Sequence, residues 1–410
     1  MSSVARRKLG DIADSCLGKM LDKEKNKGAF HPYLANYNVR WGEFDLTNVQ
    51  EMKFEDHEHE RYGLEYGDLV ICEGGEPGRC AVWRDNVPDM KIQKALHRLR
   101  VKSGFSYDFL YYRILLANRT SELQKYFIGS TIKHLTGVSL KQVEFDFPCH
   151  EEQVSIGTVL RSLDQKIELN NRINAELEAM AKTLYDYWFV QFDFPNDSPQ
   201  GQGKPYKTSG GKMVYNPTLK REIPEGWSDK TLSEIANITM GQSPEGSSYN
   251  DEGVGTIFYQ GSTDFGWLFP TTRQYTTAPS RMAKKGDILL SVRAPVGDMN
   301  IANTDCCIGR GLAALNSKTG SDGFLFYVMK YFKQIFDRRN SEGTTFGSIT
   351  KNDLHSLTLA YPTSDLLKKY DEIVTNYNKM IFERSLENRE LIALRDWLLP
   401  MLMNGQVTVE

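Results

Sequence analysis

Two stretches of this sequence decide its fold, because they repeat one another. Residues 129–148 read GSTIKHLTGVSLKQVEFDFP and residues 343–362 read GTTFGSITKNDLHSLTLAYP, at an offset of 214 positions. Two more pairs of matching blocks precede them in the same order: LGDIADSCLGK from Leu9 with LSEIANITMGQ from Leu232, and YGDLVICEGGEPG from Tyr66 with KGDILLSVRAPVG from Lys285. Three matching blocks in one order indicate a tandem repeat, so both halves are expected to share one topology.

Each copy begins with short runs that are typical of strands. Residues 68–72 and 287–292 are mostly apolar and follow Gly-Asp turns, while residues 142–147 and 356–361 end at a proline. Apolar or alternating runs of this length, bounded by turn residues, predict β-strands. The globular part of each copy is therefore expected to mix strands with shorter helices.

Each copy ends in a run with helical periodicity. From Ile156 to Trp188, apolar or asparagine residues step by four and three positions, and the run from Leu367 to Leu398 repeats the pattern with more polar interruptions. This spacing predicts two long coiled-coil helices. The polar residues on the seam either have a functional role or set the register and orientation of the pair, and we favour the second reading; they are Asn170, Asn174, Arg384 and Asn388.

The composition between the copies indicates a linker. Residues 192–227 are rich in Gly, Pro, Ser, Lys and Asn, which is typical of a surface segment. The predicted fold class is α+β, with two tandem-repeat globular domains and two long helices that form an antiparallel coiled coil about a pseudo-two-fold axis. The expected segments are a first domain (1–150), a first helical region (151–191), the linker (192–227), a second domain (228–364) and a second helical region (365–410).

Such an architecture is suited to reading DNA at two points. A helix of about 35 residues is roughly 50 Å long at about 1.5 Å per residue, so it can hold two domains a fixed distance apart. Duplex DNA has its own two-fold axes, and successive turns of its helix are about 34 Å apart. The repeat therefore favours a molecular ruler with one reading head at each end.

The overall charge does not reveal a nucleic-acid partner, but its distribution does. The 410 residues carry a formal net charge of −3, whereas residues 79–141 carry 12 basic and 4 acidic residues and residues 273–351 carry 12 and 6. Equivalent parts of both copies are thus basic, which favours contact with phosphates, although a basic run alone is often a solvated face. The sequence has no run of 18 apolar residues and no secretory leader, so a cytoplasmic location is expected.

The candidate DNA contacts lie in these basic segments. The repeated loop offers glycines for close backbone approach and hydroxyl or basic side chains for phosphates; its other reading is a capped turn. The candidates in and beside this loop are Ser130, Thr131, Lys133, His134, Thr344, Thr345 and Lys351. The remaining candidates are basic residues of the two segments: Arg79, Lys91, Lys94, Arg98, Arg273, Arg281, Lys284, Arg293 and Arg310.

Motifs of catalysis are weak. The sequence has no Gly-x-x-x-x-Gly-Lys-Ser/Thr loop for a nucleoside triphosphate, and its six cysteines form no Cys-x-x-Cys pair. Glu51 and Lys53 have a nuclease-like spacing after Asp45, and residues 57–60 read His-Glu-His-Glu, which could bind a metal. Both patterns arise often in a charged chain, so no catalytic or metal site is predicted. A nuclease or methyltransferase with diverged motifs, and a scaffold that binds only proteins, remain the alternatives.

The ends of both long helices have more apolar residues than packing against a single partner helix requires. Aromatic and apolar residues gather at 184–190 and 397–403, and such residues are enriched in interface cores. They either dock partner subunits or pack against the chain's own repeat. The candidates are Tyr185, Trp188, Phe189, Trp397 and Leu398.

The repeated blocks, the helix LDQKIELNNRINAELEAMAKTLYDYWF and the linker GKPYKTSGGKMVYNPTLKREIPEGW together resemble the specificity subunit of bacterial type I restriction-modification enzymes over nearly the whole chain. The resemblance implies two target recognition domains that each read one half of a split DNA sequence. It also implies a non-catalytic subunit without cofactors of its own. The expected partners are duplex DNA, two copies of an adenine methyltransferase subunit and an ATP-dependent restriction subunit, which supply S-adenosylmethionine, ATP and Mg²⁺ chemistry. Arg384 and Arg395 on the second seam depart from an apolar coiled coil, which leaves the packing of that helix open.

Overall fold

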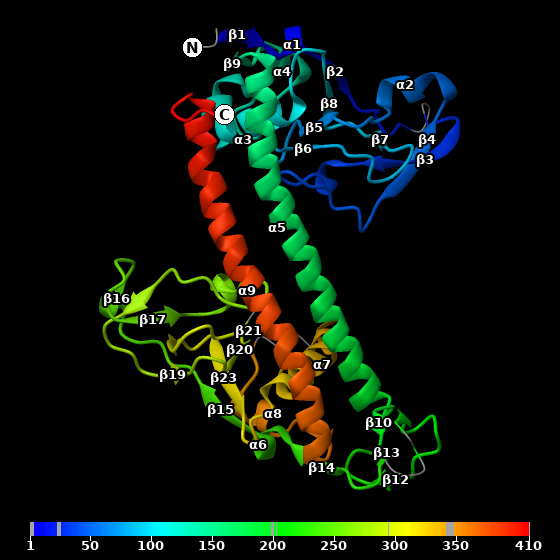
Figure 1. Ribbon diagram of the computed structural model, residues 1–410, viewed down its shortest axis with the longest axis vertical. Coiled ribbons are helices and arrows are strands. Elements are labelled where there is room, and N and C mark those ends of the chain that lie inside the picture. The colour runs from blue at the N-terminus through cyan, green and yellow to red at the C-terminus, as the bar shows by residue number, and fades with distance from the viewer. Residues whose placement is uncertain are drawn as a thin grey trace. The chain divides into compact units, whose positions relative to one another are not determined.

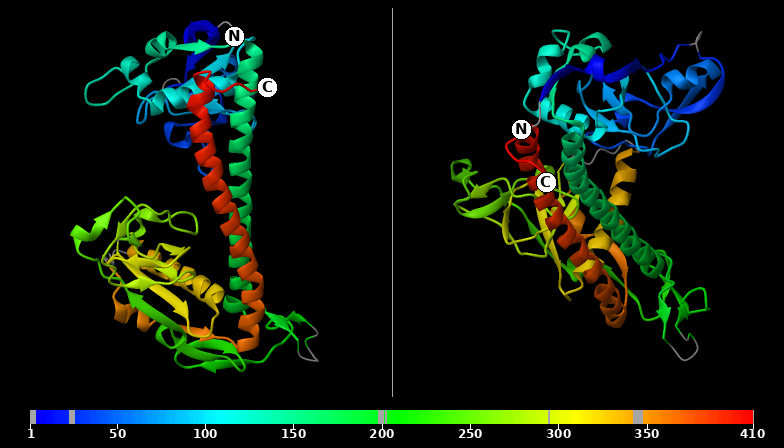
Figure 2. Two further views of the ribbon diagram at one scale, coloured as in Figure 1. Left: turned by 60° about the vertical axis from the view of Figure 1, so that its left-hand side comes forward. Right: turned by 45° about the horizontal axis from the view of Figure 1, so that its top comes forward.

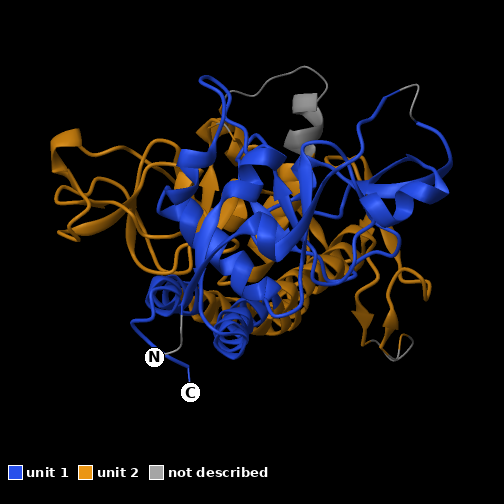
Figure 3. Ribbon diagram, turned by 90° about the horizontal axis from the view of Figure 1, so that it is seen from above, with its two compact units in different colours: residues 1–168, 390–410 blue, residues 169–389 orange. Residues whose placement is uncertain are grey.

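The computed structural model describes residues 4–22, 26–197, 201, 203–293, 295–341 and 348–409, with the side chains of 335–341 left undescribed. The chain forms two compact units, which are coloured separately in Figure 3. Unit 1 contains Met1–Glu168 and Glu390–Glu410, and unit 2 contains Leu169–Arg389. Unit 1 is therefore built from both ends of the chain, and each unit contains a part of both long helices.

The described residues of unit 1 form nine short strands, four short or medium α-helices and parts of the two long helices. Figure 1 labels these elements. In chain order its elements are β1 (Ala5–Lys8), α1 (Leu9–Ile12), β2 (Ala13–Leu17), β3 (Ala29–Leu34), β4 (Gln50–Phe54), α2 (His59–Tyr62), β5 (Leu69–Cys72), β6 (Cys80–Val82), β7 (Lys91–Ile92), β8 (Leu96–Val101), α3 (Tyr107–Arg119), α4 (Gly137–Gln142), β9 (Glu144–Phe147) and the long helix α5 (His150–Tyr185).

Unit 2 begins within α5, which continues as a π-helical turn (Asp186–Val190). The following elements are β10 (Pro195–Asn196), β11 (Lys204–Pro205), β12 (Met213–Asn216), β13 (Arg221–Pro224), β14 (Ser228–Thr231), α6 (Leu232–Ile235), β15 (Ala236–Met240), β16 (Tyr249–Asn250), β17 (Thr256–Tyr259), β18 (Tyr275–Thr276), β19 (Met282–Ala283), β20 (Ile288–Ser291), β21 (Met299–Ile301), β22 (Cys306–Ile308), β23 (Leu312–Ser317), α7 (Asp322–Ser341), α8 (Lys351–His355), β24 (Thr358–Tyr361) and the long helix α9 (Ser364–Met403).

The two units share one topology, which confirms the prediction made from the repeat. In unit 1 the main sheet has the order β2-β8-β5-β6, and in unit 2 it has the order β15-β23-β20-β21. The first and last strands of each unit pair antiparallel, as β1 with β9 and as β14 with β24. Each unit also has one parallel pair, β3 with β7 and β17 with β22.

The aligned glycines explain why the repeat is visible in the sequence. The backbone N–H of Gly18 donates to Leu96, and the N–H of Gly241 donates to Leu312, both at 2.9 Å. A Cβ atom on Gly18 would lie 2.3 Å from the carbonyl oxygen of Gln93, and one on Gly241 would lie 2.2 Å from that of Gly309. Only glycine allows this close backbone approach, so both copies keep it.

In unit 1 the beginning of α5 packs against the end of α9. Ile156 and Leu160 of α5 belong to the same buried cluster as Leu399 and Leu402 of α9. Beside them the guanidinium of Arg395 donates to Asp164 at 2.8 Å. Arg395 therefore forms an ion pair with α5. The sequence alone does not show how α9 packs at this position of the seam.

In unit 2 the two helices pack antiparallel, side by side, as the seam pattern predicts (Figure 2). The hydroxyl of Tyr370 donates to the carbonyl of Ala181 at 3.2 Å. Further along, the side-chain amide of Asn170 donates to Oδ1 of Asn388 at 2.9 Å, and that of Asn388 donates to Oδ1 of Asn171 at 2.8 Å. These amide bonds of the buried Asn170 and Asn388 favour one alignment of the helices, which supports the reading that these two seam asparagines set register.

The segment predicted as a linker forms two hairpins, β10-β11 and β12-β13. Contrary to the expectation from its composition, it also contributes to the core of unit 2. Ile223 and Trp227 are buried, and the rings of Phe194 and Trp227 stack at 5.5 Å. The hairpins bring the few large apolar residues of this segment together in the core. The amino-acid composition of the segment does not show this arrangement. None of the helices described here is long and apolar enough to cross a membrane.

Candidate nucleic-acid interface

Three loops of unit 1 meet through backbone hydrogen bonds. The N–H of Leu135 donates to the carbonyl of Glu73 at 2.8 Å, and the N–H of Glu73 donates to Ala95 at 2.9 Å. These bonds join the loop after β5 (73–79), the turn before β8 (93–95) and the repeated loop before α4 (128–136). We call these residues the three-loop site of unit 1.

Unit 2 repeats this arrangement at equivalent positions. The N–H of Ile349 donates to Val292 and the N–H of Val292 donates to Gly311, both at 2.9 Å. Arg293 also forms an isolated antiparallel bridge with Ser348. The three-loop site of unit 2 comprises the described residues 292–293, 295–298, 309–311 and 348–350.

Most of the candidates from the repeated loop and its neighbours lie at these two sites. In unit 1 they are Lys94, Ser130, Thr131, Lys133 and His134, all exposed. In unit 2 they are Arg293 and Arg310, with Lys351 directly after the site, and all three are exposed. Thr136 and Thr350 cap the following helices, accepting from the N–H of Ser139 and Asp353 respectively. The repeated loop therefore agrees with both interpretations of the sequence, because an exposed loop is followed directly by a turn that caps a helix.

Lys94 and Arg310 occupy equivalent positions. Each lies two residues before the last strand of its main sheet, Lys94 before β8 and Arg310 before β23. Each directly follows the residue whose carbonyl oxygen lies against the aligned glycine. This residue is Gln93, next to Gly18, in unit 1 and Gly309, next to Gly241, in unit 2. The structure thus puts one exposed cation at the same corner of both three-loop sites.

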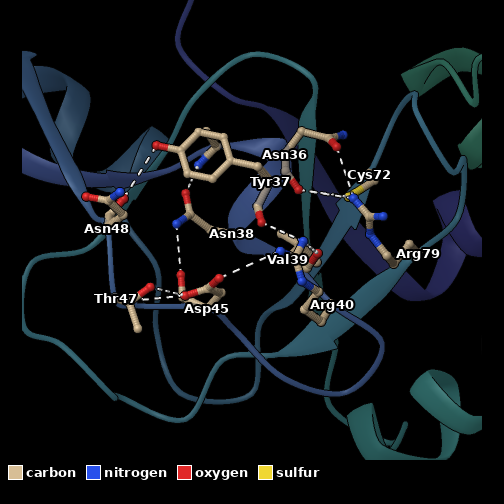
Figure 4. Close-up of polar contacts among 11 residues, drawn as sticks. Asn36, Tyr37, Asn38, Val39, Arg40, Asp45, Thr47, Asn48, Cys72 and Arg79 are labelled. Atoms are coloured by element: carbon tan, nitrogen blue, oxygen red, sulfur yellow. Dashed lines mark hydrogen bonds and ion pairs between the residues drawn. The ribbon is translucent and has the colours of Figure 1, made fainter. Parts of the chain in front are cut away.

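Arg79 has a different role from the one predicted, because its guanidinium is bonded within unit 1 (Figure 4). It donates to the side-chain and backbone oxygens of Asn36 at 3.0 and 3.2 Å, and it forms an ion pair with Glu76 at 3.2 Å. Asn36 in turn donates to the carbonyl of Gly74 at 2.9 Å. Arg79 therefore ties the loop after β3 to the three-loop site instead of pointing to solvent.

Lys91 and Arg98 are wrong as DNA contacts, since both are buried. The guanidinium of Arg98 donates to the carbonyls of Glu60 and Gly63 at 3.1 and 2.8 Å. Lys91 begins β7, where Tyr33 and Gly63 pair with it. The strands that carry them, β7 and β8, lie inside the unit. A count of basic residues in the sequence does not distinguish buried from exposed side chains.

The remaining candidates of unit 2 lie away from the three loops in sequence. Arg273, Arg281 and Lys284 precede β20 and are exposed, and Arg273 donates to the buried Asp264 at 2.8 Å. Thr344 and Thr345 lie outside the described residues.

Two exposed amides lie next to Arg310, and no sequence pattern predicts them. Gln242 follows Gly241, and the amide of Gln260 donates at 2.9 Å to the hydroxyl of Ser243, which accepts from the N–H of Arg310 at 3.3 Å. Amide side chains can bind adenine through two hydrogen bonds, so these residues are suited to reading bases. The aligned Gly241 marks this turn, but only the folded chain brings Gln260 to it.

The predicted partner contacts divide into two groups. Tyr185, Trp188 and Phe189 are buried in the core of unit 2, where all three rings contact Tyr370. They are therefore wrong as docking residues, and the alternative of packing within the chain applies to them. Leu398 is partly buried in unit 1, whereas Trp397 is 57% exposed.

The weak catalytic patterns have ordinary structural partners. Asp45 accepts from the backbone and the hydroxyl of Thr47, which lowers the pKa of its carboxyl. Glu58 forms an ion pair with Lys19, and the ring of His59 packs against that of His31. Among the described residues, no three histidine, cysteine or acidic side chains are grouped so that they could hold a metal.

Residues 1–179 and 224–388 match the family described as the type I restriction modification DNA specificity domain. The chain is 27% identical over 422 residues to a putative type I restriction enzyme MjaX specificity subunit of Methanocaldococcus jannaschii, covering 98% of this chain and 93% of the relative. It is 23% identical over 354 residues to the HindI specificity subunit of Haemophilus influenzae, covering 72% and 76%. The crystal structure of a type I restriction-modification S subunit from M. genitalium superposes with a TM-score of 0.63 at 18% identity, covering 98% of this chain and 96% of that one.

Proposed function

The chain belongs to the family of type I restriction-modification specificity subunits, and from this premise we propose that each of its units reads one half of a split DNA sequence. The observation that carries the proposal is the pair of equivalent three-loop sites. Each presents an exposed cation, Lys94 or Arg310, at the same corner of the same fold. Phosphate contacts position a protein on DNA and nearby polar side chains read bases, and both kinds of group are present.

Mapping methylated adenines tests this function. The DNA of a cell that expresses this chain with its methyltransferase partner should carry methylation within one sequence made of two specific halves and an unread gap. The same partner without this chain should leave that sequence unmethylated. Methylation that follows one continuous short sequence, or that persists without this chain, contradicts the proposal.

Charge reversal at the two equivalent cations is expected to weaken DNA binding. In the complex with the methyltransferase partner, Lys94→Glu or Arg310→Glu should lower affinity for target DNA about tenfold and reduce the salt dependence by about one phosphate contact. The measurement is fluorescence anisotropy with labelled duplex at several salt concentrations.

The matched controls lie at the other end of the same strands. Lys102 follows β8 and Lys318 follows β23, and both are exposed. Lys102→Glu and Lys318→Glu should change affinity less than threefold. Equal losses for the controls and the loop variants would assign the effect to net charge and not to the three-loop sites.

We further propose that methyltransferase subunits contact the end of α9. Leu394 and Trp397 are three residues apart, so they share one face of the helix, and they are 43% and 57% exposed. Large exposed apolar groups of this kind are typical of interface anchors. Replacing Trp397 by alanine should weaken the complex at least tenfold in analytical ultracentrifugation.

A second exposed aromatic residue provides the control for Trp397. Tyr215 of β12 is 62% exposed, and Tyr215→Ala should leave assembly unchanged. If Trp397→Ala assembles as tightly as Tyr215→Ala does, the end of α9 is not the docking site.

The chemistry is proposed to belong to the partner subunits. S-adenosylmethionine, ATP and Mg²⁺ are expected there, and the complete complex would act on DNA in the cytoplasm. Support comes from the family, whose members are named as specificity subunits of restriction enzymes.

A further inference from the structure

Unit 2 contains a cavity of about 440 Å³ that is distinct from its three-loop site. The cavity is bordered by the turn before β20, the end of β21, the start of α7 and one face of α9. Its walls include two aromatic rings, Phe269 and Phe382, whose centroids are 4.6 Å apart. They also include two carboxylates, Asp322 of α7 and Asp371 of α9.

The equivalent space in unit 1 is filled by side chains. Gly67 and Gly286 are equivalent, since their N–H groups donate to Trp83 and Ala302 in the same turn. A Cβ on Gly67 would lie 2.9 Å from the ring of Tyr107, whereas one on Gly286 would meet no atom within 4 Å. The aromatic ring that closes this space in unit 1 is therefore missing from unit 2.

An arginine occupies the rest of that space in unit 1. Arg84 donates to Asp108 at 2.5 Å and to the hydroxyl of Tyr66 at 3.4 Å, and its guanidinium lies 5.9 Å from the ring centre of Tyr107. The repeat offset of 219 that relates Gly67 to Gly286 aligns Arg84 with Asn303, which lines the cavity. Unit 2 thus lacks the guanidinium as well as the ring.

The carboxylate, in contrast, is kept in both units. In unit 1 Asp108 of α3 faces Gly157 of α5, where a Cβ would lie 3.1 Å from the Cβ of Asp108. In unit 2 the glycine is Gly323 of α7, and a Cβ there would lie 2.6 Å from Oδ1 of Asp371 of α9. The carboxylate lies on the shorter helix in unit 1 and on the long helix in unit 2, and the glycine lies on the other helix of each pair. Each unit therefore has a carboxylate where these two helices meet.

Neither carboxylate of the cavity is ion-paired within the part of the chain that the structure describes. No basic side chain of the described residues forms an ion pair with Asp322 or Asp371; they accept from the backbone N–H groups of Ser317 and Phe324 respectively. Burial raises the pKa of both carboxyls, and an adjacent cation would reverse this effect. Lys285 and Lys379 also line the cavity, but both are exposed residues with long flexible stems.

Two further polar groups of the wall lack partners. The side-chain oxygens of Asn303 and Asn378 are buried and accept no hydrogen bond from any described residue. Buried acceptors without donors are rare and destabilising. The wall therefore offers carboxylates and aromatic rings, which is the environment that a guanidinium group prefers, and it also contains two unpaired amide oxygens.

We propose that this cavity binds a guanidinium group supplied from outside the chain, in the place that Arg84 fills in unit 1. The group is carried either by a small molecule or by an arginine side chain of a partner protein. This inference does not depend on DNA recognition, because it rests on the cavity and its filled counterpart alone.

Calorimetric titration of the purified chain with N-methylguanidinium tests the proposal, and N-methylurea is the matched probe of similar shape without charge. N-Methylguanidinium should bind one site and raise the melting temperature, and N-methylurea should bind at least ten times more weakly. Asp371→Asn and Asp322→Asn should each raise the dissociation constant at least tenfold. Absence of binding, or equal binding of both probes, overturns the proposal.

Two variants separate a lost site from a lost fold. Asn303→Arg gives unit 2 the arginine that unit 1 has, so it should abolish probe binding while keeping the melting temperature at or above that of the unmodified chain. Glu372 neighbours Asp371 on α9 and is exposed, and Glu372→Gln should leave binding unchanged. If Glu372→Gln weakens binding as much as Asp371→Asn, the probe responds to general negative charge and the proposed site is wrong.

The two sources of the guanidinium are distinguished in the complex. If an arginine of the methyltransferase partner fills the cavity, the assembled complex should no longer bind N-methylguanidinium. Binding that persists in the complex at unchanged affinity identifies a small molecule instead.

Discussion

Exchange of residues 228–364 for the same segment of another specificity subunit is expected to change one half of the methylated DNA sequence completely and to leave the other half unchanged. The structure gives the reason in the pairing of β14 with β24. Ser228 lies opposite Tyr361 in this antiparallel pair, so the two ends of the segment are neighbours and the exchanged part begins and ends at one place. The three-loop site of unit 2 is then replaced as a whole.

The reciprocal exchange is the matched control. In unit 1, β1 pairs with β9, and Ala5 lies opposite Phe147. Exchange of residues 1–150 should change only the half that the first experiment left unchanged. Sequencing of methylated adenines reports both outcomes. A single exchange that alters both halves would mean that the units do not read DNA independently.

Replacing Tyr370 by alanine is expected to destabilise unit 2 by about 3 to 5 kcal/mol, the range for removal of a large buried aromatic side chain. Tyr370 is fully buried, and its ring contacts those of Tyr185, Trp188, Phe189 and Tyr327. Its loss removes the centre of the cluster that joins α5, α7 and α9. Amide hydrogen exchange of β20 and β23 should accelerate by two to three orders of magnitude.

Unit 1 provides the internal reference for this measurement. The exchange rates of β5 and β8, which lie in unit 1, should stay within a factor of three in the same sample. Tyr370→Phe should cost only about 1 kcal/mol, because it removes the single hydrogen bond to Ala181 and keeps the ring. An alanine variant that exchanges no faster than the phenylalanine variant contradicts the assigned role of the ring cluster.

The sequence predicted the fold well because its signals are backbone requirements. Gly18 and Gly241 allow a close approach of chains, and the steps of four and three residues in both long runs follow from helix geometry. The three-loop sites could be predicted only in part. Lys94 and Arg310 lie outside the matching blocks of the sequence, so only the folded chain shows that their positions are equivalent. The backbone bonds that assemble each site join distant parts of the chain, Glu73 with Ala95 and Leu135 in unit 1 and Val292 with Gly311 and Ile349 in unit 2.

The wrong predictions share a physical cause. The guanidinium groups of Arg79 and Arg98 are bonded within unit 1, and Lys91 is buried there. Trp188 is an aromatic residue that its own unit buries. Residue type and local spacing are the same for an inward and an outward side chain. Only the three-dimensional neighbours decide between them, and those neighbours come from distant parts of the sequence.

The division of the chain into units has a consequence for its synthesis. Unit 1 needs Leu399 and Leu402 to complete its core, and a ribosome adds these residues more than 200 positions after Leu160, the preceding residue of that core. At about 5 to 20 residues per second the delay is roughly 10 to 40 s, during which the nascent domain waits with apolar surface uncovered. Unit 1, whose synthesis begins first, is thus completed last. A chain truncated before Leu399 is expected to have a destabilised N-terminal half.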